Sequence, residues 1–256
     1  MPDKIDPPHA TGVALKTVEA HAEPNDLVFH AGWFCPFVQR VWIALEEKGI
    51  EYQYKEVDPY KKEPHFLKVN PKGLVPAIEY KGKALYESLV LLEFLDSAFP
   101  SSRPLLPSDP IEAGYARLAA SQISTVVVPA FYKLLQAQSD EEQAAAREGF
   151  EKVLREVVEQ WWLPDKTWAR SDDFGFVDAA LAPWVARLEL LVQHRKFSPS
   201  AAGKRFEEWA KKVLERDSVR RTSSPQESYA SVYERYLNNT AESEVAKATR
   251  KGEWLK

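Results

Sequence analysis

The sequence predicts two structural regions, an α/β domain followed by an all-helical domain. Short hydrophobic runs alternate with helical patterns over residues 26–100, whereas only helical patterns follow residue 110. Four prolines between Pro100 and Pro110 mark a linker between the two regions. The predicted segments are an irregular extension at 1–25, an α/β domain at 26–100, a linker at 101–110, and a helical domain with a C-terminal tail at 111–256.

The α/β domain is predicted from alternating patterns and turn signals. Gly49 is a good C-terminal cap for a helix, and Lys81-Gly82 is a hairpin turn in which Gly82 supplies the positive φ. The expected elements are a strand near 27–31, a helix at 36–48, a strand at 51–57, a short helix near 63–69, strands at 75–80 and 84–87, and a helix capped by Ser88 that runs to Phe99. This β-α-β-α-β-β-α order is thioredoxin-like.

Two helices are clearly marked in the second region. Ser139 and Glu142 form a capping box before a long helix with one apolar face. A second helix begins near Gly175, and Pro183 should kink it because proline removes one backbone hydrogen bond. The tail from Thr240 to Lys256 has no clear interpretation.

Composition excludes several classes of protein. A net charge of −4, spread along the chain, argues against nucleic-acid binding. We expect no metal site, because the five histidines are scattered along the sequence. No apolar run approaches the roughly 20 residues of a membrane span, and the N-terminus lacks the apolar core of a signal peptide. A cytoplasmic, soluble protein is expected, since a single cysteine fits a reducing compartment.

Cys35, the only cysteine, lies at the predicted strand-to-helix junction. Pro36 follows at the first helical position, where a missing N–H costs nothing. The backbone N–H groups and the positive end of the helix dipole at such a position favour thiolate over thiol. A buried structural cysteine is the alternative, but this position favours a reactive one.

The absence of a second cysteine limits the redox chemistry. Thiol–disulfide exchange passes through a mixed disulfide that another thiol must resolve. In a C-x-x-C oxidoreductase the same chain supplies that thiol, but Val38 occupies the corresponding position here. A second thiol must therefore come from solution, and glutathione is the abundant candidate.

From about residue 25 to 238 the chain resembles the cytosolic glutathione transferases. The segment Cys35-Pro36-Phe37 is similar to the signature of the Omega class, whose catalytic residue is cysteine where other classes use tyrosine or serine. Residues 70–76 resemble the family's loop leading into a cis-proline, here Pro76. Residues 178–189 resemble the Omega version of the sixth helix.

The resemblance implies a glutathione site in the first domain. Glu87 and Ser88 match the pair that holds the γ-glutamyl end, and the backbone of Val75 would pair with the tripeptide like an added strand. In the family a lysine binds the glycine carboxylate of glutathione. The spacing to that lysine is one residue longer in this chain than in the family, so Lys62 is the first choice for this role and Lys61 the second. Cys35 is catalytic in this interpretation, and the glutathione-binding residues are Phe37, Lys62, Val75, Glu87 and Ser88.

Two predicted residues are structural, Pro76 and Asp178. The family's capping Ser or Thr, three residues before Asp178, is replaced by Gly175, which is an acceptable N-cap but lacks a side chain for the capping box.

The acceptor site is expected between the domains, facing the cysteine, and its candidates by family position are Trp184, Arg187 and Tyr229. The chain has eight tryptophans, which cannot all line a site, and any one of them is about as often part of a packed core.

The predicted function is a homodimeric, glutathione-dependent thiol transferase or reductase of Omega type. It would use glutathione as co-substrate and accept a small hydrophobic or aromatic molecule, or dehydroascorbate. The alternatives are a non-catalytic carrier of phenolic ligands, a glutathione-dependent β-etherase, and a glutathionyl-hydroquinone reductase, which usually shows C-P-W where this chain has Phe37. A scaffold protein of the same fold would generally lack the cysteine motif.

Overall fold

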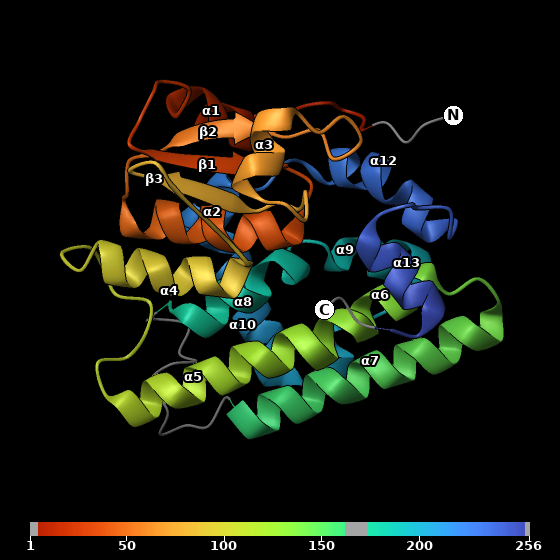
Figure 1. Ribbon diagram of the computed structural model, residues 1–256. Helices are drawn as coiled ribbons and strands as arrows, with labels where there is room; N and C mark the ends of the chain where they lie inside the picture. Colours follow the sequence, from red (N-terminus) through yellow and green to blue (C-terminus); the bar gives the residue numbers. More distant parts are fainter. Residues whose placement is uncertain (1–4, 162–173, 254–256) are drawn as a thin grey trace. The chain divides into compact units, whose positions relative to one another are not determined.

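A computed structural model describes residues 5–161 and 174–253 of the chain (Figure 1). The chain forms two compact units. One combines Met1–Pro107 with Glu215–Tyr229, and the other combines Ser108–Leu214 with Ala230–Lys256. The chain first passes between units within the predicted linker. The return of residues 215–229 to the first unit differs from the prediction that all of 111–256 forms one helical domain.

A four-stranded mixed sheet is the centre of the first unit. Its strand order is β2-β1-β3-β4, with β1 parallel to β2 and antiparallel to β3, and with β3 antiparallel to β4. The strands are β1 (Leu27–Ala31), β2 (Gln53–Glu56), β3 (Ala77–Tyr80) and β4 (Lys83–Tyr86). Lys81 and Gly82 both have positive φ, as the hairpin turn requires. The predicted thioredoxin-like order is confirmed.

The two faces of the sheet are covered by different helices, α2 (Pro36–Lys48) and α3 (Pro64–Val69). Successive strand residues point to opposite faces, so Phe29 and His30 lie on opposite sides of β1. Phe29 contacts Tyr54, whose ring lies 5.0 Å from that of Trp42 on α2. His30 lies 5.6 Å from the ring of Phe66 on α3. The helix α4 (Ser88–Ala98) packs against α2 (Figure 1).

The N-terminal region contains a helix, which corrects the prediction that residues 1–25 are irregular. The helix α1 (Gly12–Ala20) occupies the proline-free part of that segment. Tertiary contacts hold it, because the Thr17 hydroxyl donates to the Arg221 carbonyl at 2.8 Å and the Thr11 hydroxyl bonds that of Ser228 at 2.7 Å. Pro7, Pro8 and Pro24 all lie outside this helix.

The returning segment 215–229 is bound to α2 by polar side chains. The carboxylate of Glu47 accepts hydrogen bonds from Arg216 and from the Ser218 hydroxyl, the latter at 2.8 Å. Gln39 is completely buried and donates its amide to the Thr222 carbonyl at 3.1 Å. The short helix α11 (Asp217–Arg221) contacts both α1 and α2.

The second unit is helical. Its long helices α5 and α7 lie side by side in Figure 1, and α6 contacts α7. The helices are α5 (Pro110–Gln122), a π-helical turn (Ile123–Val127), α6 (Val128–Gln136), α7 (Asp140–Trp161), α8 (Phe176–Val185), α9 (Leu188–Arg195), α10 (Lys204–Glu215), α12 (Gln226–Leu237) and α13 (Glu244–Lys251), with a 3-10 turn at Pro199–Ala202. The first turn of α12 belongs to the first unit.

Both predicted caps of the helical unit are present. Glu142 N–H donates to the Ser139 hydroxyl at 3.1 Å, and Glu142 Oε2 accepts from Ser139 N–H at 3.3 Å. Asp178 Oδ2 accepts from the N–H of Gly175, the N-cap of α8, at 2.9 Å. Asp178 Oδ1 also accepts from Trp209 Nε1–H at 2.7 Å, so this buried carboxylate ties α8 to α10.

One helical run in the described parts, Pro110–Gln136, is long and apolar enough to cross a membrane by length and composition. Half of its most apolar window is buried inside the protein, as is typical of a core helix. The helix α13 packs on α6, where Gln136 donates its amide to the Ala246 carbonyl at 3.3 Å. The start of the tail therefore belongs to the helical unit, while Trp254 lies outside the described residues.

Candidate functional site

Cys35 is the N-cap residue of α2, and Pro36 is the first residue of that helix. Cys35 N–H donates to the Gly32 carbonyl at 2.9 Å, and the Cys35 carbonyl accepts from Gln39 N–H at 3.0 Å. The residue is partly exposed. The predicted strand-to-helix junction is therefore confirmed, and a thiol at this position lies next to the positive end of the helix dipole.

Arg40 joins two of the predicted glutathione-binding residues. Its guanidinium lies 5.4 Å from the centre of the Phe37 ring, and its Nη1 donates to the Ser88 hydroxyl at 3.2 Å. Arg40 is only 1% exposed, although arginine is rarely so buried without a specific role. Sequence reasoning missed Arg40, because only the fold brings the second turn of α2 next to the start of α4.

Glu87 has a strained backbone immediately before α4. Its φ is 76°, a value that costs a non-glycine residue on the order of 1–3 kcal/mol. Glu87 is the N-cap and Ser88 the first helical residue, which corrects the prediction that Ser88 caps this helix. The Glu87 carbonyl already accepts from Leu91 N–H, so α4 begins one residue earlier than the sequence indicates.

The Glu87 side chain is exposed and forms an ion pair with Lys72 at 2.9 Å. The hydrogen bond to Glu87 raises the pKa of Lys72. Lys72 was not among the predicted site residues, although it lies within the loop that sequence analysis singled out. An exposed carboxylate held in place by a strained backbone is suited to binding a cationic group.

The loop between α3 and β3 is organised by Asn70, which is buried. Its side-chain amide donates to the Leu74 carbonyl at 2.7 Å, and its Oδ1 accepts from Lys72 N–H at 3.0 Å. The Val75–Pro76 peptide bond is cis, as the sequence predicts. Val75 itself is partly buried against the cluster between α3 and the sheet.

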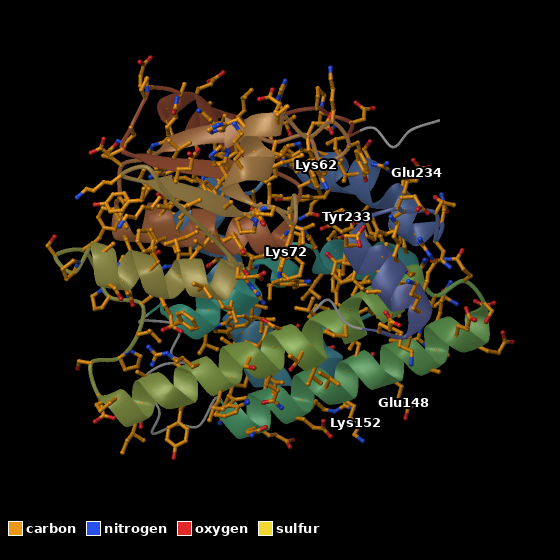
Figure 2. The ribbon with its side chains drawn as sticks, viewed as in Figure 1. Lys62, Lys72, Glu148, Lys152, Tyr233 and Glu234 are labelled. Carbon is orange, nitrogen blue, oxygen red and sulfur yellow. The ribbon has the colours of Figure 1, made fainter. Side chains whose placement is uncertain are left out.

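Lys62 lies across this loop at Gly73. A Cβ atom added to Gly73 would lie 3.0 Å from Lys62 Nζ and 2.9 Å from Lys62 Cδ, so the glycine leaves room for the lysine. Gly73 also has a φ of +63°, which glycine adopts without strain. Lys62 and Lys72 flank α3 in the sequence, and both side chains are labelled in Figure 2. This position of Lys62 supports it over Lys61 as the residue facing the loop.

A half-buried acid, Glu56, contacts the segment that leads to Cys35. Glu56 Oε1 accepts from Trp33 N–H at 3.1 Å, and Oε2 has no exposed surface. Burial raises the pKa of Glu56 to about 7, an effect that the bond from Trp33 partly offsets. The Tyr54 hydroxyl lies near the carboxylate without the geometry of a full hydrogen bond. Sequence reasoning did not identify Glu56.

The fold also brings together three residues that could hold a metal ion, His30, His65 and Glu79. Glu79 Oε1 lies 2.7 Å from His30 Nε2 and 3.0 Å from His65 Nε2. Burial lowers the pKa of His30, and the bond with Glu79 only partly offsets this. The histidines that are scattered in the sequence are thus not all scattered in space.

The three acceptor candidates are all buried, with exposed fractions of 1% for Trp184 and 0% for Arg187 and Tyr229. Within the helical unit Arg187 donates from Nε to the Tyr233 hydroxyl at 2.9 Å and from Nη1 to the Pro183 carbonyl at 2.6 Å. In the other unit Tyr229 packs on Trp33, with ring centres 5.7 Å apart. A ligand would reach these side chains only after their neighbours move.

The family model and the most similar curated proteins point to the same family. Residues 34–98 match the family model "Glutathione S-transferase, N-terminal domain". The chain is 34% identical over 188 residues to glutathione S-transferase U25 of Arabidopsis thaliana, covering 73% of this chain and 84% of that protein. It is 33% identical over 196 residues to glutathione S-transferase U19 of the same plant, covering 76% and 88%.

Solved structures agree. Glutathione transferase Omega 3C from Trametes versicolor has a TM-score of 0.84 and 52% sequence identity, covering 92% of this chain and 100% of that one. Rice GST1 in complex with glutathione has a TM-score of 0.75 and 31% identity, covering 84% and 98%. Similarity therefore extends to two classes, Omega and the plant Tau class. Both sequence and fold lead to one conclusion, that the chain belongs to the glutathione S-transferase family.

Proposed function

We propose that this protein is a glutathione-dependent thiol transferase of Omega type. The observation that carries the proposal is Cys35 at the N-cap of α2, followed by Pro36 and Phe37. A serine or tyrosine at such a position can stabilise the thiolate of glutathione but cannot form a disulfide with it. The 52% identity to an Omega transferase supports the same class.

The proposed reaction has two balanced steps. In the first, the Cys35 thiolate attacks the glutathionyl sulfur of a mixed disulfide, forms a Cys35–glutathione disulfide, and releases the acceptor as a thiolate. In the second, the thiolate of another glutathione attacks the glutathionyl sulfur of that disulfide. Oxidised glutathione leaves and the Cys35 thiolate is regenerated. A glutathione-rich reducing compartment such as the cytoplasm would supply the second thiol.

The first unit would bind glutathione along the start of α4 and the loop that follows α3. We assign the ammonium of the γ-glutamyl group to Glu87, beside or in place of Lys72, and its carboxylate to the region of Ser88. Lys62 would meet the glycine carboxylate, and the Val75 backbone would pair with the tripeptide. The Lys72–Glu87 ion pair, both of whose partners are exposed, supports this assignment because it already shows an ammonium bound at Glu87.

One of the two alternatives has specific support from the comparisons. The 34% identity to a plant U-type transferase favours conjugation of glutathione to an electrophile. A carrier of phenolic ligands would bind without turnover. The acceptor candidates Trp184, Arg187 and Tyr229 stay predictions, since their burial requires rearrangement before they contact a small hydrophobic acceptor or dehydroascorbate.

The test compares wild-type protein with Cys35→Ser. Both are assayed for release of glutathione from a glutathionylated peptide, and for conjugation to 1-chloro-2,4-dinitrobenzene. We expect the wild type to transfer thiols and to carry a glutathionyl adduct on Cys35 by mass spectrometry. Cys35→Ser should lose about a hundredfold or more of the transfer activity, since no nucleophilic sulfur remains.

Three outcomes distinguish the alternatives. Full transfer activity in Cys35→Ser would refute the catalytic assignment. Conjugation by the wild type at a higher rate than thiol transfer would favour the Tau-like function. Binding of glutathione without either reaction would favour a carrier. Lys62→Ala serves as a binding control, because it should raise the KM for glutathione while the Cys35 adduct still forms at saturating glutathione.

A homodimer is the proposed assembly. Three large apolar side chains, Ile111, Tyr115 and Leu118, are exposed at helical spacing along α5, with exposed fractions of 66%, 39% and 56%. A stripe of this kind on a helix is typical of a protein interface. Leu118→Glu should therefore shift the mass measured by light scattering from dimer to monomer, whereas a wild-type monomer would refute the assembly.

A further inference from the structure

Three elements of the first unit converge on the cluster of His30, His65 and Glu79. His30 is on β1 and Glu79 on β3, two positions along from Ala77, the partner of His30 in the antiparallel register. The two side chains therefore lie diagonally on the same face of the sheet. His65 reaches the same carboxylate from α3, the helix that covers this face.

The donor set matches that of a metal centre. Two imidazole nitrogens and one carboxylate form a known three-ligand set for Zn²⁺, in which a water or substrate takes the fourth position. The three donor atoms lie within 4.8 Å of one another. Tetrahedral coordination needs donor atoms roughly 3.3 Å apart, from metal–ligand bonds of about 2.0–2.2 Å. The two N···O distances, 2.7 and 3.0 Å, therefore need to open by less than about 1 Å.

Two of the three ligand side chains are exposed enough to adjust their positions. The side chain of His65 is 60% exposed and that of Glu79 is 24% exposed, whereas His30 is 3% exposed and fixed in the sheet. One rigid ligand and two adjustable ones allow coordination without disturbing the core. Lys55, paired with His30 in the strand register, is the nearby cation that opposes binding of a positive ion.

We propose that His30, His65 and Glu79 bind a divalent transition-metal ion of the zinc type. Bound metal would fasten α3 to the sheet, in place of the hydrogen bond between His65 and Glu79 that now does so. The proposed reaction of Cys35 does not use this cluster, and the inference does not depend on it. The alternative is a carboxylate that simply bridges two imidazoles.

The test titrates the full-length protein with Co²⁺ and Zn²⁺ after treatment with a chelator. Co²⁺ reports coordination by its visible absorption bands, and thiolate ligation by Cys35 would add an intense charge-transfer band in the near ultraviolet. Zn²⁺ affinity is measured by competition with a chromophoric chelator. We expect one ion per chain with no thiolate band, and Zn²⁺ should raise the midpoint of thermal unfolding, since it binds the folded state.

The variants are chosen to leave the fold intact. His65→Ala and Glu79→Gln each remove one ligand and should weaken Zn²⁺ binding about tenfold or more, since even indirect support of a metal ligand contributes that much. His194→Ala, which removes an exposed histidine from α9, is the matched control and should bind as the wild type does. Equal affinity in His65→Ala and His194→Ala, or no ion bound by the wild type, would overturn the proposal.

Discussion

The pH dependence of stability should change when Glu56 is replaced by glutamine. Glu56 has a folded-state pKa of about 7, raised from 4.5 chiefly by burial. A raised carboxyl pKa contributes stability that is fully present below the unfolded pKa and is lost as the pH rises through the folded pKa. Glutamine keeps an acceptor for Trp33 N–H and does not titrate.

The expected magnitude follows from the shift. A difference of about 2.5 pKa units corresponds to at most about 3 kcal/mol, because each unit is about 1.4 kcal/mol and the residue is partly exposed. The free energy of unfolding of Glu56→Gln, minus that of the wild type, should therefore increase between pH 4.5 and pH 7 and then level off. The glutamine variant gains stability relative to the wild type as the pH rises.

The assay is urea unfolding of both proteins at several pH values from below 5 to above 7. Other titrating groups occur in both proteins and cancel in the difference, provided they do not contact residue 56. A difference that stays flat across this range would refute the argument. A difference that decreases as the pH rises would mean that Glu56 is stabilised as a carboxylate in the folded state.

Three further substitutions test separate features. Gly73→Ala should weaken glutathione binding, measured by fluorescence titration, because the new methyl group collides with Lys62 at a φ of +63°; unchanged affinity would remove Lys62 from the site. Asp178→Ala should cost roughly 2–4 kcal/mol of unfolding free energy in urea, since it leaves two buried donors unbonded. Arg187→Ala should cost a similar amount, roughly 2–4 kcal/mol, and leave glutathione affinity unchanged; weaker binding of a phenolic dye in a stably folded variant would instead restore Arg187 to the acceptor site.

Local patterns were sufficient to predict much of the first unit. The apolar face of residues 36–48, with Pro36 at the start and Gly49 as the cap, predicts a helix over this range. The helix in the structure has the same limits. The prediction was wrong where tertiary contacts decide the outcome. The helix α1 is held by the hydrogen bond from Thr17 to Arg221, which is 204 residues away in sequence. The local sequence around Thr17 does not predict a partner so far along the chain.

Contacts between residues far apart in the sequence explain other differences between the predicted and the observed sites. Arg187 is an acceptor candidate by its family position, and the fold provides its guanidinium with a hydroxyl and a carbonyl as partners. The expectation of no metal site followed from five histidines scattered along the sequence, among which His30 and His65 are 35 positions apart. A sheet and a covering helix bring such positions together, and only the strand register shows which residues meet.

The two faces of β1 separate the proposed metal site from the thiol. His30 faces α3, whose flanking loops carry Lys62 and Lys72, whereas Phe29 lies on the side of α2, the helix that begins after Cys35. A metal ion that fastens α3 should therefore change the affinity for glutathione more than the reactivity of the thiol.

S-methylglutathione is a suitable probe, because its blocked sulfur neither reacts with Cys35 nor binds zinc as a thiolate. Zn²⁺ should shift its dissociation constant in the wild type and not in His65→Ala, while the rate at which iodoacetamide alkylates Cys35 stays the same in both. If Zn²⁺ slows alkylation and leaves the dissociation constant unchanged, the ion acts at Cys35 and the separation of the two faces does not hold. Because the probe reports on the loops and the alkylation rate on the thiol, the two measurements distinguish a metal at His30 from one at the cysteine.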